Sequence, residues 1–156
     1  MNLDTLERLV IDVLNTGVES LHDLGSITPV CFAFRASGEY DILVGDDKSV
    51  MQKELASGKY ETWIILNEAW MVSLENGQGA NYTLVEALAR SVGVRNLPSR
   101  VEVVTVFGRS LEGCMYLTQE FTHTSNGIAM GKITVCSERY DPSHLITSWM
   151  TARQFQ

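Results

Sequence analysis

The stretch that decides the predicted fold is Trp63-Ile64-Ile65-Leu66-Asn67-Glu68-Ala69-Trp70-Met71-Val72. Apolar side chains occupy its odd and its even positions alike, with Asn67 and Glu68 as the interruption near the centre. A strand that is apolar on both faces is usually covered on both sides, by helices or by a partner chain. The stretch therefore predicts a central strand, in which Glu68 needs a cation or several hydrogen-bond donors.

The amino-terminal segment predicts a helix that covers one face of this strand. Asp4 is the expected N-cap, with Glu7 completing a capping box. Gly17 is a candidate interruption, and Gly25 is the expected end of the helix. The apolar stripe of this helix consists of Leu6, Leu9, Val10, Val13 and Leu14.

The remaining segments complete the predicted order of elements. Two strands, residues 30–35 and 40–44, flank a turn at Ser37-Gly38, and a second helix runs from Asp46 or Asp47 to Ser57. A loop over residues 75–81 and a short helix over residues 83–92 follow the central strand. Three strands, residues 100–108, 114–123 and 128–137, form a meander, and the tail from Asp141 is ambiguous between helix and extended chain.

Two predicted turns set the register of the meander. Asn126-Gly127 suits a two-residue type I′ turn, and Leu111-Glu112-Gly113 suits a three-residue loop. These turns place Phe107 opposite Leu117, Val103 opposite Phe121, and His123 opposite Met130. The predicted buried face holds Val101, Val103, Phe107, Met115, Leu117, Phe121 and Met130. The predicted outer face holds Arg100, Glu102, Tyr116, Thr118, Glu120 and Thr122, mixed with Val104, Val106, Ile133 and Val135.

These elements predict an α+β fold, with a largely antiparallel sheet of about six strands and the amino-terminal helix packed on one face. The 156 residues suit a single domain over residues 1–156. A face that the helices leave uncovered would be buried by a second copy of the chain.

Composition argues against several classes of partner. The net charge of −7 and the scattered Lys and Arg residues disfavour a nucleic-acid surface. No secretory signal and no apolar run long enough to span a bilayer is recognisable, so we expect no membrane association and a cytoplasmic location. Cys31, Cys114 and Cys136 are unclustered, and we interpret them as buried thiols of a reducing compartment.

Carboxylates are the main candidates for chemistry. Glu102 and Glu120 are predicted to share one sheet face, where they could hold a hard cation or divide acid and base roles, or simply belong to a solvated face. Glu68 is expected to pair with an arginine, with Arg100, Arg95 and Arg35 as the candidates, and a catalytic carboxylate is the alternative. Catalytic residues are therefore not assigned, although Glu68, Glu102 and Glu120 are the candidates. Arg95 and Arg100 join Glu68 and Glu102 as a possible ligand or ion-pair cluster.

No familiar catalytic or metal-binding motif is present in the sequence. His22, His123 and His144 lack metal-ligand spacing, and the glycines match neither a Walker A loop nor a dinucleotide fingerprint. We therefore expect no metal site and no cofactor, and we favour a binding module over an enzyme.

One resemblance concerns the central strand and the strand after it. Glu68-Ala69-Trp70-Met71, followed by Pro98-Ser99-Arg100-Val101-Glu102-Val103-Val104, resembles a pattern in a family of small uncharacterised bacterial proteins. In that family an acidic-Ala-Trp-Met strand precedes a Pro-x-Arg-x-Glu strand. The family has no assigned activity, so the resemblance implies only that Glu68, Arg100 and Glu102 form one cluster.

The sequence thus favours a small cytosolic binding or assembly protein that forms homo-oligomers. Val104, Val106, Ile133 and Val135 are the predicted dimer interface. The alternative function is a small hydrolase or cation-dependent enzyme that uses the carboxylate cluster.

Overall fold

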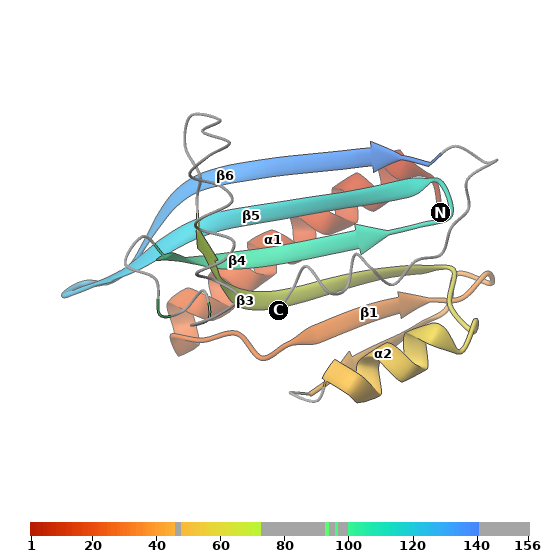
Figure 1. Ribbon diagram of the computed structural model, residues 1–156, viewed down its shortest axis with the longest axis horizontal. Helices are drawn as coiled ribbons and strands as arrows, with labels where there is room; N and C mark the ends of the chain where they lie inside the picture. Colours follow the sequence, from red (N-terminus) through yellow and green to blue (C-terminus); the bar gives the residue numbers. More distant parts are fainter. Residues whose placement is uncertain (46–47, 73–92, 94–95, 97–99, 141–156) are drawn as a thin grey trace.

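A computed structural model describes residues 1–45, 48–72, 93, 96 and 100–140 of the chain (Figure 1). The elements in order are α1 (Leu3–Leu24), β1 (Val30–Phe34), β2 (Tyr40–Val44), α2 (Lys48–Ala56), β3 (Thr62–Val72), β4 (Arg100–Arg109), β5 (Gly113–Thr124) and β6 (Gly127–Arg139). The six strands form one antiparallel sheet in the order β2-β1-β3-β4-β5-β6. The predicted α+β fold with an amino-terminal helix on the sheet is therefore confirmed.

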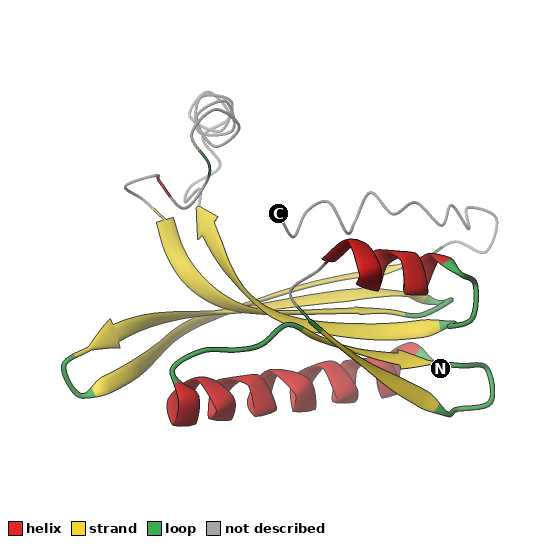
Figure 2. Ribbon diagram, turned by 90° about the horizontal axis from the view of Figure 1, so that it is seen from below, coloured by secondary structure: helices red, strands yellow, loops and turns green. Residues whose placement is uncertain are grey.

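The two helices lie on opposite faces of the sheet (Figure 2). α1 packs across β3, β4 and β5, where Ile64 and Leu66 of the central strand join its buried side chains. α2 packs over β1 and β3 on the other face, through Leu55 and Met51. Residues 63–66 of the central strand β3 are thus covered by helices on both sides, as the two apolar faces predicted, whereas Trp70 further along the strand is 41% exposed.

The ends of α1 are set by local hydrogen bonds. The N-cap is Asn2, whose side chain accepts a hydrogen bond from the Thr5 N–H at 2.9 Å, so the predicted capping box at Asp4 and Glu7 is wrong. Asn is as good an N-cap as Asp, and the earlier cap makes the helix begin at Leu3 rather than after Asp4. Gly25 ends the helix as predicted, with φ of 75° and its N–H bonded to the Leu21 carbonyl at 2.8 Å.

Two glycines allow α1 to lie close to the sheet. Gly17 does not interrupt the helix. It is buried, and a Cβ atom built there would lie 2.6 Å from Cδ1 of Leu66. Gly108 on β4 faces the helix from the sheet side, where a Cβ atom would lie 2.4 Å from Cγ2 of Val10. The helix and the sheet therefore touch where side chains are absent.

Both turns of the meander differ from the prediction. Ser110 and Gly113 close the first hairpin, with the Ser110 N–H bonded to the Gly113 carbonyl at 2.8 Å, so the loop is Leu111-Glu112. In the second hairpin Thr124 lies opposite Gly127, so the turn is Ser125-Asn126. Gly127 has φ of 122° and follows the turn rather than forming its centre.

The shifted turns move the β4–β5 register by one residue. Phe107 lies opposite Tyr116, and Val103 lies opposite Glu120. The β5–β6 prediction also fails, because Phe121 lies opposite Met130 and a bulge follows Gln119. Both faces of β4 are apolar, so the hydrophobic pattern did not decide between the registers.

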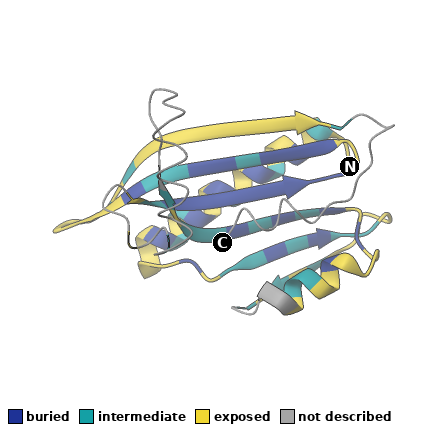
Figure 3. Ribbon diagram, in the orientation of Figure 1, coloured by how far each residue is buried: buried dark blue, intermediate teal, exposed yellow. Residues whose placement is uncertain are grey.

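The register exchanges the faces of β4. Val104 and Val106 are fully buried and join the core under α1 together with Leu117 and Phe121. Val103 is buried on the opposite face. Figure 3 shows β4 as buried along most of its length and β6 as exposed. The predicted dimer interface is therefore wrong at Val104 and Val106, although Ile133 and Val135 are exposed on β6.

The other predicted elements are found within one to three residues of their expected bounds, and the Ser37-Gly38 turn is present. The loop over residues 75–81, the helix over residues 83–92 and the tail from Asp141 lie outside the described residues.

The close approach at Gly108 predicts the effect of adding one methyl group. Gly108→Ala should lower the free energy of unfolding by about 1–3 kcal/mol, because the new Cβ displaces Val10 and Leu6 in a filled core. Strand propensity alone predicts the opposite sign. Gly131→Ala on the exposed strand β6 is the matched control, since its Cβ would be 3.4 Å from the nearest atom. Chemical denaturation of both variants checks this; equal stabilities would contradict the packing argument.

Candidate functional site

Three of the predicted site residues, Arg100, Glu102 and Glu120, line a cleft where the sheet forks, whereas Glu68 lies outside it. The end of β3 and the start of β4 bend away from the tip of the β5–β6 hairpin (Figure 2). A cleft of about 440 Å³ opens in this fork. Its lining residues are Trp70, Arg100, Val101, Glu102, Glu120, Phe121, Thr122 and His123.

Three contacts define the chemistry of the fork cleft: one ion pair, one cation–π contact and one contact between rings. His123 Nε2 lies 3.4 Å from a Glu102 carboxylate oxygen, which is an ion pair when the imidazole is protonated. The guanidinium of Arg100 lies over the ring of Trp70, 5.0 Å from its centroid. The His123 ring meets Phe121 edge-on at 5.6 Å. The cleft is an open, mixed surface of aromatic rings and charges.

Glu102 and Glu120 do not share a sheet face. Glu102 lies opposite Phe121 and Glu120 lies opposite Val103, so the one-residue change of register separates them. Both border the fork cleft, but from opposite sides of the sheet. The prediction that these carboxylates act together from one face is therefore wrong.

Glu68 has a structural role that the sequence did not reveal. One of its carboxylate oxygens accepts the Ile27 N–H at 2.6 Å, from the segment that joins α1 to β1. Ile27 is buried in the core under α1, so its backbone donor needs a partner. Arg100 lies opposite Val72 and Glu68 opposite Val104, so the two positions are four residues apart along the strand pair. A Glu68–Arg100 pair stays a prediction, and Arg95 lies outside the described residues.

A second polar cluster, at the other end of the sheet, was missed by the sequence reading. The Asp41 carboxylate accepts a hydrogen bond from the Tyr60 hydroxyl at 2.6 Å and forms ion pairs with Arg35 and Lys59. Arg35, a candidate partner of Glu68, is thus bound to Asp41. These residues come from the β1–β2 hairpin and the link between α2 and β3. Their spacing carries no local pattern, and only the fold brings them together.

Two hydrogen bonds hold the pKa of Asp41 below its ordinary value. The bond from Tyr60 has the larger effect, and the bond from Lys59 has the next largest. The Asp41 cluster therefore ties the hairpin to the start of β3, on the side of the sheet that carries α2.

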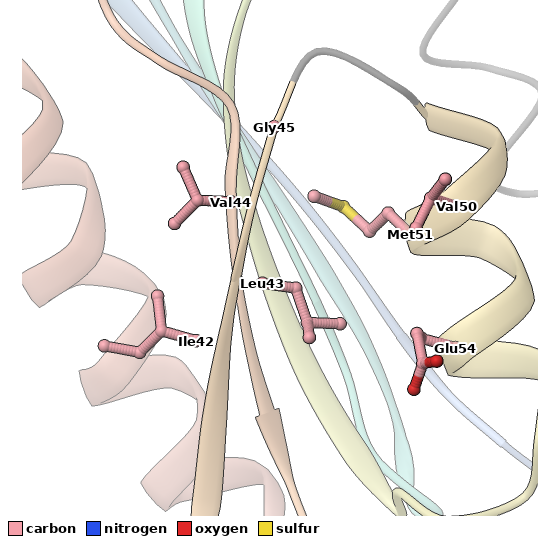
Figure 4. A pocket seen from close by; sticks show the side chains of 7 residues that line it. All are labelled: Ile42, Leu43, Val44, Gly45, Val50, Met51 and Glu54. Carbon is pink, nitrogen blue, oxygen red and sulfur yellow. The ribbon is translucent and has the colours of Figure 1, made fainter.

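The outer edge of β2 has a different character. Tyr40, Ile42 and Val44 are all exposed on one face of this edge strand. On the other face, Leu43 points toward Met51 and Glu54 of α2 across a groove of about 490 Å³ (Figure 4). Apolar side chains therefore flank the edge on both sides.

The backbone of this edge is also available. The Arg35 N–H bonds to the Glu39 carbonyl and the Gly45 N–H to the Pro29 carbonyl. Antiparallel pairs alternate, so these two bonds direct the N–H and C=O groups of Tyr40, Ile42 and Val44 away from β1. Among the described strands, none pairs with that side of β2.

The three cysteines differ in their burial. Cys31 and Cys114 are buried, and burial raises the pKa of the Cys31 thiol to about 12. Cys136 is exposed on the edge strand β6, which corrects the expectation of three buried thiols. Within residues 1–45, 48–72, 93, 96 and 100–140, no three His, Cys, Asp or Glu side chains form a group suited to a metal ion.

The chain matches no protein-family model, no curated protein and no solved structure. No helix of the described residues is long and apolar enough to cross a membrane.

The Glu68–Ile27 hydrogen bond predicts a graded loss of stability. Glu68→Ala should cost about 1–3 kcal/mol, because it leaves the buried Ile27 N–H without an acceptor. Glu68→Gln keeps an acceptor oxygen and should cost less. Chemical denaturation checks the order, with Glu7→Ala on the exposed side of α1 as control. Arg100→Met and the double variant Glu68→Gln with Arg100→Met test the predicted ion pair in the same assay. If their effects on the free energy of unfolding are additive, the ion pair is excluded.

The lowered pKa of Asp41 predicts an acid-sensitive contribution to stability. A carboxyl whose pKa is lowered by folding stabilises the fold above its unfolded pKa, and this contribution is lost as pH falls through the folded pKa. At pH 7 the free energy of unfolding of the wild type should exceed that of Asp41→Asn. The difference between the two should narrow as pH falls from about 5 to about 2. Denaturation at a series of pH values checks this. Asp12→Asn controls for the loss of one negative charge, and a gap independent of pH would contradict the prediction.

Proposed function

We propose that this protein is a binding and assembly module whose β2 edge pairs with the β2 edge of a second copy. The observation that carries the proposal is the combination of exposed apolar side chains at Tyr40, Ile42 and Val44 with backbone groups that no described strand pairs. Their exposed fractions are 55%, 53% and 66%. Such an edge is a template for strand addition unless it is blocked.

The edge is complementary to itself. Antiparallel pairing about a two-fold axis at Ile42 places this residue against its own copy and Tyr40 against Val44 of the second copy. Aromatic and β-branched residues directly opposite each other are favourable cross-strand pairs. The nearest carboxylate on the strand, Asp41, points to the other face and is already held by Arg35 and Lys59. Continuing the sheet through β2 would therefore bring apolar groups together without an unpaired charge from this strand.

The opposite edge of the sheet is a weaker candidate. β6 is also exposed, but it carries Lys132, Glu138 and Arg139, and its pairing with β5 is broken by a bulge. Charges and bulges are the usual protection against edge pairing. Ile133 and Val135 therefore form a smaller apolar area, on a strand whose charges and bulge disfavour edge pairing.

The proposal includes a cytosolic location and partners other than nucleic acid. Three free cysteines are compatible with a reducing compartment, and the net charge of −7 disfavours phosphate backbones.

The alternative, a small hydrolase or cation-dependent enzyme, would use the fork cleft. The Glu102–His123 pair beside Trp70 is the observation in its favour. Against it, Glu120 approaches from the other side of the sheet, and Glu68 is occupied by the Ile27 N–H. Loss of an ester or phosphate hydrolysis activity in Glu102→Gln would favour the enzyme over the assembly module.

Self-pairing through β2 predicts the mass of the particle in solution. Light scattering of wild type should give the mass of two chains, falling to one chain on dilution. Ile42→Lys should give one chain at all concentrations, because two lysines would face each other across the axis. Ile133→Lys, at an exposed fraction of 50%, is the matched control on β6 and should remain dimeric. One-chain mass for the wild type across concentrations, or loss of the dimer in Ile133→Lys alone, would overturn the proposal.

A further inference from the structure

We propose that the pocket around Arg109 binds the carboxylate of a small apolar acid. The pocket has a volume of about 260 Å³ and lies where the end of α2 meets the start of β3, the end of β4, the β4–β5 loop and Tyr140, which follows β6. This site is separate from the β2 edge and from the fork cleft. Its lining residues are Leu55, Ala56, Gly58, Tyr60, Glu61, Trp63, Arg109, Ser110, Leu111 and Tyr140.

Arg109 is the unusual residue of this pocket. Its exposed fraction is 8%, and its guanidinium lies between two aromatic rings, 5.0 Å from the centroid of Trp63 and 5.7 Å from that of Tyr140. Trp63 and Arg109 are direct cross-strand partners in β3 and β4, so the sheet holds the stack in place. Ring faces stabilise the cation but accept none of its in-plane hydrogen bonds.

The charge of Arg109 is not neutralised within the described part of the chain. No carboxylate of the described residues lies within ion-pair distance of it, and no described side chain or carbonyl accepts a hydrogen bond from it. Burial, then the hydrogen bond with Cys114, raises the pKa of Tyr140, so this phenol is neutral at pH 7. A buried guanidinium with free donors facing a pocket is a site for an anion with paired oxygens.

The surroundings favour a carboxylate over a phosphate. Glu61 borders the pocket, and the Glu138 charge acts on Tyr140 from β6, so two negative charges lie near a single arginine. A dianion would be repelled more strongly than a monoanion. Leu55, Ala56 and Leu111 supply an apolar wall for the rest of the ligand. The planar edge of one carboxylate matches one guanidinium fork.

Titration of the full-length protein with benzoate tests the site. We expect saturable shifts of the Trp63 indole and Arg109 side-chain NMR signals. Arg109→Met should weaken benzoate binding at least tenfold, which is about 1.4 kcal/mol. Arg100→Met is the matched control, because Arg100 also lies 5.0 Å over a tryptophan, and it should bind as wild type. Should Arg109→Met not fold, Arg109→Lys carries the test: it retains the charge, loses the fork and should also bind at least tenfold more weakly.

Two further probes identify the ligand class and its source. Inorganic phosphate should not displace benzoate, and tighter binding of phosphate would overturn the carboxylate assignment. N-acetylphenylalanine, which imitates a peptide C-terminus, should bind while its amide does not. Its affinity relative to benzoate then distinguishes a peptide end from a free acid. Absence of a saturable response in wild type, or equal binding by the Arg109 variants, would show that the chain itself satisfies Arg109 and would overturn the proposal.

Discussion

The contact between α1 and the sheet is the constraint on which the rest of the structure depends. Gly17 on the helix and Gly108 on β4 remove the side chains that would hold the two layers apart. Leu66 and Val10 then fill the space directly, and the buried residues of α1 reach three strands at once. This contact determines which face of β4 lies against α1, because Val104, Val106 and Gly108 lie under the helix. The opposite face, with Val103, is buried on the side of the sheet that carries α2.

The choice of face in turn determines which polar residues can meet. Glu102 shares a face with Trp70 and His123, whereas Glu120 is turned to the other side. Glu68 lies on the face of the sheet that carries α1, close to the end of this helix. Its carboxylate accepts a hydrogen bond from the Ile27 N–H, which is a structural role. Glu68 and Asp41 thus hold a connecting segment and a hairpin in place.

The two proposed binding surfaces have different physical bases. The β2 edge offers open backbone groups and exposed apolar side chains, so its affinity would come from hydrogen-bonded strand addition and apolar burial. The Arg109 pocket offers one desolvated charge between aromatic rings, so its affinity would come from a charge-assisted bidentate contact. Tyr60 stands between these regions, with its hydroxyl on Asp41 and its ring lining the Arg109 pocket. A ligand in the pocket would therefore lie against the residue that secures the β1–β2 hairpin.

Local sequence was sufficient to determine the order and type of the eight described elements. The two apolar faces of Trp63 to Val72 indicated a doubly covered central strand, and Gly25 and Ser37-Gly38 marked chain reversals, because these signals act within a few residues. Tertiary structure alone decided the β4–β5 register and hence the faces of Glu102, Glu120, Val104 and Val106. A strand that is apolar on both faces has no preferred side until a helix packs on it. The Asp41 cluster and the Arg109 stack were not predicted for a second reason. Their members are distant in the sequence, and only sheet pairing and helix packing bring them together.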